Sequence, residues 1–224
     1  QTFATIAPYT IEEAYEVADA IERGAWRELE GELGDLLLQV IYFAQMGEEA
    51  GHFGWDGICA RIADKMIARH PHIFGDEGRD KTAEQQAADW EAIKAAERGV
   101  RAGTLAGVAL GLPALTRAVK LQARAARVGF DWPSAAEVVD KIAEEAAELV
   151  AAQGLTPEAR VEEFGDLMFV MANLARHLKI DPEAALRAAN AKFERRFARI
   201  EALLAADGRR PEDSDLAEMD ALWN

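Results

Sequence analysis

The sequence predicts an all-α protein built from two related halves. Seven prolines separate longer segments rich in Ala, Leu, Glu and Arg, and no segment alternates apolar and polar residues between hairpin turns. A second observation is that an ordered set of residues recurs on both sides of a glycine-rich stretch, which is typical of an internal repeat. These two observations together predict two small helical domains.

The first half contains four predicted helices. Thr10 is followed three residues later by Glu13, a capping-box pattern that predicts a helix from Ile11 to about Glu22. The third helix is expected to end before Pro71, because the residue that precedes a proline disfavours the α region. The four expected ranges are 11–22, 26–49, 55–69 and 83–98.

A glycine-rich stretch from Gly99 to Pro113 holds a single charged residue and is interpreted as a connector. We therefore expect a first repeat at 1–99, a connector at 100–113 and a second repeat at 114–224. Ser134 and Asp181 stand where helix N-caps are expected. The helices expected after the connector are 114–128, 135–153, 157–178, 182–206 and 213–223.

Composition excludes several classes of function. The chain of 224 residues has 40 Asp and Glu against 25 Lys and Arg, and this net charge of −15 would repel a nucleic-acid polymer. The longest run without a polar residue, 105–115, is 11 residues long, whereas about 20 are needed to cross a bilayer. No membrane association is expected, and the single cysteine, Cys59, favours a reducing, cytoplasmic location. Because the chain starts at Gln1 without a methionine, we expect it to be part of a longer product.

Four carboxylates of the second half have the spacing of a metal site. Glu145 and Glu148 lie three residues apart on one face of a predicted helix, and Glu163 and Asp166 do so on the next. The turn at 154–157 makes these helices antiparallel neighbours, so the four groups can meet. Like charges at close quarters repel unless a cation neutralises them or their pKa values rise. Ligands that offer only oxygen favour Mg²⁺, with Mn²⁺ as the other choice.

The alternative interpretation is a solvated acidic face, and two features argue against it. Glu163 heads a helical stripe of apolar residues and is therefore expected to face inward. The whole set also recurs in the first half, as a candidate second metal site at Glu13, Glu16, Glu32 and Asp35. In the second half Lys192 and Arg196, four residues apart, form a basic edge suited to phosphate oxygens. No P-loop is present, so a metal and side chains must hold a polyphosphate.

These motifs resemble those of the MazG family of nucleoside triphosphate pyrophosphohydrolases over essentially the whole chain. The family signature EExxE followed by ExxD occurs at 12–16 with 32–35 and again at 144–148 with 163–166. The resemblance implies two tandem helical-bundle repeats, Mg²⁺-dependent hydrolysis of a nucleoside or deoxynucleoside triphosphate to the monophosphate and pyrophosphate, and a homodimer. In tandem members the second repeat is associated with catalysis.

The resemblance also implies roles for individual residues of the second repeat. The metal ligands would be Glu145, Glu148, Glu163 and Asp166. The nucleotide contacts would be Lys141, Glu144, Glu162, Lys192, Arg196 and Trp223. Either Glu144 or Glu145 would orient the attacking water or accept its proton. Members of the family usually carry a Cys-Pro-Trp-Asp motif just before the position of Gln1, so we expect a truncated first repeat; its counterpart in the second repeat is 130–132.

Two other functions stay open from the sequence. The protein would then be a catalytically silent helical dimer or regulatory partner, or an enzyme of narrow specificity for dUTP, dCTP or phosphoribosyl-ATP. Three tryptophans, Trp90, Trp132 and Trp223, are each candidates for stacking on a base.

Overall fold

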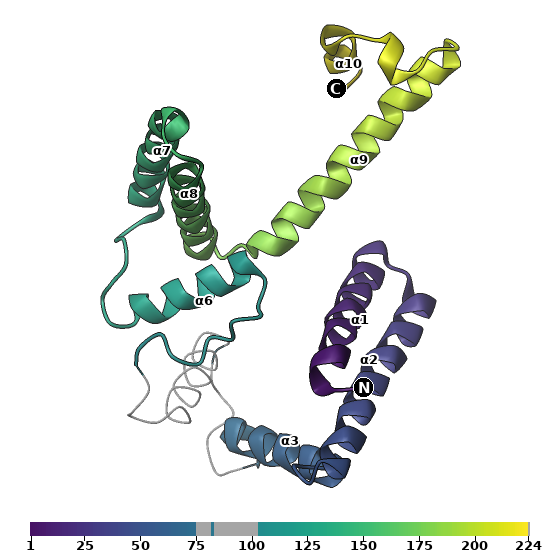
Figure 1. Cartoon of the computed structure of the whole chain (residues 1–224), viewed down its shortest axis with the longest axis vertical. Helices are drawn as coiled ribbons and strands as arrows, with labels where there is room; N and C mark the ends of the chain where they lie inside the picture. The colour runs from purple at the N-terminus through teal and green to yellow at the C-terminus, as the bar shows by residue number, and fades with distance from the viewer. Residues whose placement is uncertain (75–81, 83–102, 224) are drawn as a thin grey trace. The chain divides into compact units, whose positions relative to one another are not determined.

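The computed structural model describes residues 1–74, 82 and 103–223. Within these ranges the chain forms only helices and their connections, which confirms the all-α class. The helix expected at 83–98, with Trp90, lies outside the described residues. The chain divides into two compact units, Gln1–Glu97 and Arg98–Asn224 (Figure 1). The finer division into repeats of 1–99 and 114–224 stays a proposal.

The first unit is built on a pair of antiparallel helices, α1 (Phe3–Arg23) and α2 (Trp26–Glu49). Between them Gly24 takes a left-handed conformation with φ of 66°, which an L side chain rarely adopts, and so ends α1. Helix α3 (Trp55–Arg69) packs on α2, and the single turn α4 (Pro71–Phe74) follows. The end of α3 before Pro71 agrees with the prediction.

The predicted start of the first helix is wrong. Helix α1 begins at Phe3 and not at Ile11, and it continues through Pro8. The side chains of Thr2 and Thr5 each accept a hydrogen bond from the backbone N–H of the other, which caps the helix eight residues earlier than expected. This reciprocal cap explains why the pattern at Thr10 does not start the helix.

The second unit contains the α7–α8 pair. Helix α7 (Ala135–Ala151) leads through the short helix η1 (Ala152–Gly154) into the antiparallel α8 (Pro157–His177). The connection is short because Thr156 caps α8 by accepting from the N–H of Ala159. Helix α6 (Ala114–Ala126) packs on α8. The tight turn holds the carboxylates of α7 and α8 on facing helices.

The last helices form a separate arm of the second unit. Helix α9 (Pro182–Ala206) begins where Asp181 accepts hydrogen bonds from two backbone N–H groups, as the Asp-Pro pattern predicts. It is followed by η2 (Pro211–Asp213) and α10 (Leu216–Trp223). The main packing partners of α9 are α6 and α10, and Figure 1 shows α9 leading away from the α7–α8 pair. None of the described helices is long and apolar enough to span a bilayer.

Candidate metal and nucleotide site

Three carboxylates of the second unit converge between α7 and α8. Glu145, Glu148 and Glu163 each offer an oxygen, and these oxygens lie within 4.8 Å of one another. Two oxygens bound to one Mg²⁺ lie at most about 4.2 Å apart, so the three side chains would have to draw closer together to hold a single ion. Asp166 lies outside this group of three, although its charge acts on Glu163. The donor set and its size fit a small divalent cation.

The sequence places this cluster at the edge of the packed interface. Val138, two turns before Glu145 on α7, is fully buried, and Val170, two turns after Glu163 on α8, is 4% exposed. Glu145 itself is only 6% exposed, and a carboxylate buried to this extent needs a partner. That partner is Lys141, whose Nζ lies 2.7 Å from Glu145.

Lys141 holds two neighbouring carboxylates at once. Its Nζ also lies 2.8 Å from Glu144, and the hydrogen bonds to Glu144 and Glu145 raise the pKa of Lys141 above its ordinary value. The side chain therefore stays a full ammonium at neutral pH. Because it lies beside the carboxylates, this ammonium is a charged hydrogen-bond donor at the edge of the cluster.

The electrostatics of Glu163 also favour a positive charge beside it. Burial raises the pKa of Glu163, and the negative charges of Glu148, Glu145, Asp166 and Glu162 raise it further. Two of the sequence-predicted residues, Asp166 and Glu162, are thus electrostatic neighbours of the cluster. A divalent cation would relieve this repulsion and favour the ionised form of Glu163.

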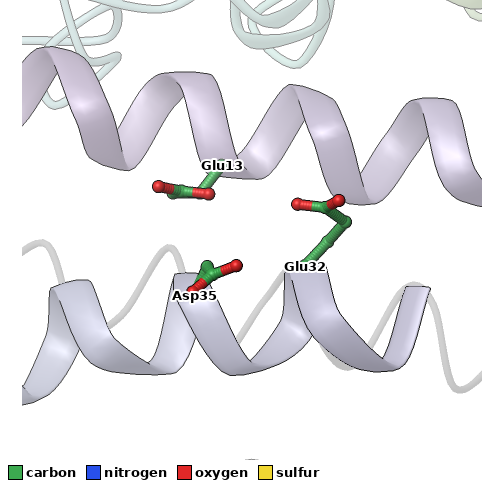
Figure 2. Close-up of side chains that lie close together, drawn as sticks. All are labelled: Glu13, Glu32 and Asp35. Atoms are coloured by element: carbon green, nitrogen blue, oxygen red, sulfur yellow. The ribbon is translucent and has the colours of Figure 1, made fainter. Parts of the chain in front are cut away.

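The first unit repeats the arrangement. Figure 2 shows Glu13 of α1 facing Glu32 and Asp35 of α2, and one oxygen of each lies within 4.8 Å of the others. Burial raises the pKa of Glu13, as do a hydrogen bond and the charge of Glu16, and Gln39 donates to Glu13 at 3.4 Å. Glu16 thus interacts with the cluster although it is outside the group of three. The position four residues before Glu13 holds the exposed Tyr9, where the second unit has Lys141.

Within a single chain, the basic edge formed by Lys192 and Arg196 lies away from the carboxylates of α7 and α8. Lys192 and Arg196 lie on α9, whose main packing partners are α6 and α10. Trp223 of α10 packs there too, with its ring centroid 5.3 Å from that of Phe193 and 5.3 Å from the Arg196 guanidinium carbon. One chain therefore does not bring these three predicted nucleotide contacts to its own carboxylates.

A cavity of about 560 Å³ was missed by the sequence analysis. It lies between α6, the 129–133 segment and α8, and its lining includes Gln122, Trp132, Phe169 and Asn173. The feature of the sequence that could have indicated this cavity is a glutamine on the apolar side of a helix. Gln122 is 5% exposed and lies one turn after the buried Ala118.

The wall of this cavity is held by an ion pair. The Asp131 carboxylate accepts a hydrogen bond from the Arg176 guanidinium and lies 3.2 Å from Nε2 of His177. Although burial raises the pKa of Asp131, its hydrogen bond and charge interaction with Arg176 hold the pKa below its ordinary value of 3.8. Arg176 also donates to Oδ1 of Asn173 at 3.1 Å. The 130–132 segment is thereby tied to the C-terminal end of α8.

The fold and the site define a class of protein: all-α, with antiparallel helix pairs that carry carboxylate clusters able to hold a divalent metal ion. Comparisons with known proteins narrow that class. The family model described as the MazG nucleotide pyrophosphohydrolase domain matches residues 1–74, and the phosphoribosyl-ATP pyrophosphohydrolase model matches residues 112–193.

Two relatives match along the whole chain and a third along part of it. The chain is 50% identical over 228 residues to the nucleoside triphosphate pyrophosphohydrolase of Escherichia coli K12, covering 100% of this chain and 86% of that protein. It is 41% identical over 224 residues to the nucleoside triphosphate pyrophosphohydrolase/pyrophosphatase MazG of Thermotoga maritima, covering 100% and 85%. A Mycolicibacterium smegmatis nucleoside triphosphate pyrophosphohydrolase is 37% identical over 134 residues, covering 58% and 41%. The chain belongs to the MazG family, as its motifs predicted.

Proposed function

We propose that the protein hydrolyses nucleoside triphosphates to the monophosphate and pyrophosphate, and that the reaction takes place at the α7–α8 cluster of the second unit. The observation that carries this proposal is the convergence of Glu145, Glu148 and Glu163 within 4.8 Å in a member of the MazG family. Asp166, on the same helix as Glu163, completes the proposed ligand set. Mg²⁺ is the proposed ion, because all the ligands are carboxylate oxygens.

The residues around the α7–α8 cluster would have separate roles in the reaction. Glu145, Glu148, Glu163 and Asp166 would hold a divalent ion, which when bound would neutralise phosphate charge and lower the pKa of a water. Glu144 and Glu145 lie beside the cluster and would orient the attacking water or accept its proton. Lys141 would donate to the phosphate chain from its position next to both carboxylates. Attack at the α-phosphorus breaks the α–β anhydride, and pyrophosphate leaves with the bonding electron pair.

The activity is tested with the full chain, MgCl₂ and a panel of nucleoside and deoxynucleoside triphosphates, by measuring released pyrophosphate. Glu163→Gln should reduce the rate at least about 100-fold, because it removes a charged ligand from the cluster. Glu158→Gln, at the exposed start of the same helix, is the matched control and should keep the wild-type rate. Full activity in Glu163→Gln would contradict the assignment of the site. An inactive wild-type protein would favour a regulatory helical dimer instead.

We further propose a homodimer in which one copy supplies the carboxylates and the other the basic edge. The proposal is supported by the path of α9, which carries Lys192 and Arg196 away from α7 and α8. It is also supported by large apolar side chains exposed on α8, including Val161 at 73% and Phe164 at 55%. A second copy would cover this apolar face and bring its α9 to the site.

Complementation between inactive variants tests this arrangement. Glu163→Gln lacks the carboxylate and Lys192→Ala/Arg196→Ala lacks the basic edge, so each homodimer should be inactive. A mixed dimer would have one intact site and one doubly damaged site. After denaturation and refolding of an equal mixture, about a quarter of the wild-type activity should return, since half the dimers are mixed. No recovery would contradict a shared site.

The match of residues 112–193 to the phosphoribosyl-ATP pyrophosphohydrolase model favours a second candidate, an enzyme restricted to that substrate. Values of kcat/KM for phosphoribosyl-ATP, dUTP, dCTP and the common triphosphates would distinguish this restricted enzyme from one of broad specificity. A broad enzyme would show comparable values across the panel, whereas a dedicated enzyme would prefer one substrate by orders of magnitude.

A further inference from the structure

The C-terminal end of the second unit contains a network of charged and polar side chains that the proposed reaction does not use. Arg209 donates to Glu218 through both terminal nitrogens, which lie 2.6 and 2.7 Å from the two carboxylate oxygens. The hydroxyl of Ser214 donates to the same carboxylate at 2.6 Å, and Arg209 also donates to the carbonyl oxygen of Asp213 at 2.8 Å. A paired contact of a guanidinium with a carboxylate fixes geometry as well as charge. The network therefore ties the segment between α9 and α10 to the first turn of α10.

Helix α10 depends on its contacts with the rest of the unit. It has eight residues, and a helix of that length is marginal in water without tertiary packing. Gly208 lets the chain turn back after α9 by taking a left-handed φ of 70°. Helix α10 packs on α9, and its partly buried positions follow a helical spacing, at 218, 219, 222 and 223. The helix is thus fixed at its first turn by Glu218 and along one face by α9.

The other end of α10 carries Trp223, which lies against the basic edge of α9. The centroid of its ring is 5.3 Å from the guanidinium carbon of Arg196 and 5.3 Å from the ring centroid of Phe193. A guanidinium within about 6 Å of an aromatic ring centroid is attracted by the ring, and it can still donate its N–H groups to phosphate oxygens. Arg196 is exposed, so without this contact its long side chain would sample many rotamers. The ring of Trp223 therefore restricts the guanidinium.

These two contacts are linked by one short helix. Glu218 lies five residues before Trp223, which is a rise of about 7.5 Å along α10. Loss of the pair between Arg209 and Glu218 would free the first turn of α10 and let Trp223 move away from Arg196. The ion pair can thus act on the basic edge without contacting it.

We propose that the ion pair between Arg209 and Glu218 positions Trp223 against Arg196 and so keeps the Arg196 guanidinium oriented for the phosphates of the nucleotide. Glu218 is a positioning residue in this arrangement, because it acts through Trp223 and does not contact the substrate. The inference rests on the proposed function, since it takes Lys192 and Arg196 as the edge that meets phosphate.

The position of Trp223 is tested without turnover, by the indole N–H resonance of this residue in the isotope-labelled full chain. The chain has five tryptophans, and Trp223→Leu identifies the resonance by removing it. Glu218→Gln and Arg209→Gln should each shift this resonance, as should Arg196→Gln. Asp220→Asn is the matched control, because it removes an exposed carboxylate of the same helix that is not part of the network. It should leave the resonance unchanged.

Calorimetric binding of the non-hydrolysable α,β-imido forms of ATP, GTP, CTP and UTP, each with Mg²⁺, measures the consequence for the nucleotide. Glu218→Gln should weaken the tightest of these complexes about two- to fivefold, the value of one exposed contact between a guanidinium and a ring. Removal of a carboxylate from an acidic chain would by itself favour an anion, so a change of charge alone predicts the opposite direction. Asp220→Asn should not weaken binding.

A double-mutant cycle separates positioning from a general loss of structure. In a Trp223→Leu background, Glu218→Gln should cause no further loss of affinity, whereas a general loss of structure would weaken binding in both backgrounds. An unshifted Trp223 resonance in Glu218→Gln, unchanged or tighter nucleotide binding, or an equal loss in the Trp223→Leu background would overturn the proposal. A wild-type protein that binds none of the four nucleotides would contradict the proposed function, and the Trp223 resonance would still decide whether Glu218 positions the ring.

Discussion

The ion pair between Asp131 and Arg176 is expected to be a main support of the second unit, and Asp131→Asn is the change that tests it. Asparagine keeps the shape and one acceptor oxygen but loses the charge. The side chains of Arg176 and Asp131 are 18% and 23% exposed, so solvent screens the pair only partly. A hydrogen bond to a charged group contributes about 1.5–3 kcal/mol, and at this exposure we expect a loss of about 1–2 kcal/mol.

A second ion pair in the chain supplies a matched control. Arg23 and Asp19 make the same kind of contact at 2.7 Å, but their side chains are 50% and 63% exposed. Thermal unfolding at pH 7 should show Asp131→Asn lowering the midpoint by about 5 °C, as expected for a unit of this size, while Asp19→Asn leaves it unchanged. Equal effects of the two substitutions would refute the reasoning that burial decides the value of the pair.

The pH dependence of the stability lost in Asp131→Asn follows from the direction in which the pKa of Asp131 is shifted. The folded pKa of Asp131 lies below the ordinary 3.8, so its contribution is complete above that value and is lost as the pH falls through the folded pKa. The difference in unfolding free energy between wild type and Asp131→Asn should therefore shrink as the pH falls below about 4. A difference that grows below that pH would contradict the sign.

Three further outcomes are expected. The raised pKa of Glu163 makes its ionised form unfavourable in the folded, metal-free protein. With a chelator present, the free energy of unfolding should therefore fall as the pH rises above 4.5, and Glu163→Gln should reduce this dependence when thermal unfolding is measured at several pH values. Calorimetric titration with Mn²⁺ should find two sites per chain, and Glu163→Gln or Glu32→Gln should each remove one of them; binding that Glu32→Gln leaves unchanged would eliminate the first-unit cluster as a metal site. Hydrogen bonds from Arg209 and Ser214 lower the pKa of Glu218 to about 2. Glu218→Gln should therefore release α10 from the end of α9 and speed amide hydrogen exchange at 216–223 at neutral pH. Unchanged exchange would show that the Arg209–Glu218 ion pair does not hold α10.

Helix boundaries were predictable where they depend on covalent or short-range chemistry. Proline constrains the residue before it and lacks an N–H, which explains why α3 ends at Arg69 and α9 begins at Pro182. The start of α1 was not predictable in this way, because two patterns compete within ten residues. The cap at Thr2 starts the helix and Pro8 removes only one hydrogen bond, so the later pattern at Thr10 falls inside it.

The candidate metal site followed from helical geometry, since residues three apart share a face whatever the rest of the fold does. That reasoning anticipated that Glu145 and Glu148 would lie together and that a tight turn would place Glu163 opposite them. It did not predict the path of α9 or the cavity beside Gln122. Both depend on how helices distant in sequence pack, so a glutamine on the apolar side of α6 could indicate a buried position but not the cavity beside it.

The two carboxylate clusters are alike in sequence but differ in their electrostatic surroundings. Glu13 and Glu145 occupy the same place in the repeated motif, and each lies within 4.8 Å of two further carboxylates. Four residues earlier the second unit has Lys141, whose ammonium lies 2.7 Å from Glu145, and the first unit has the phenol side chain of Tyr9. A fixed ammonium beside the carboxylates weakens their attraction for a bare cation and strengthens it for an anion that arrives with the cation. We therefore expect the second unit to bind a metal triphosphate and the first to bind a metal ion alone, with Lys141 in place of Tyr9 as the residue that sets this difference.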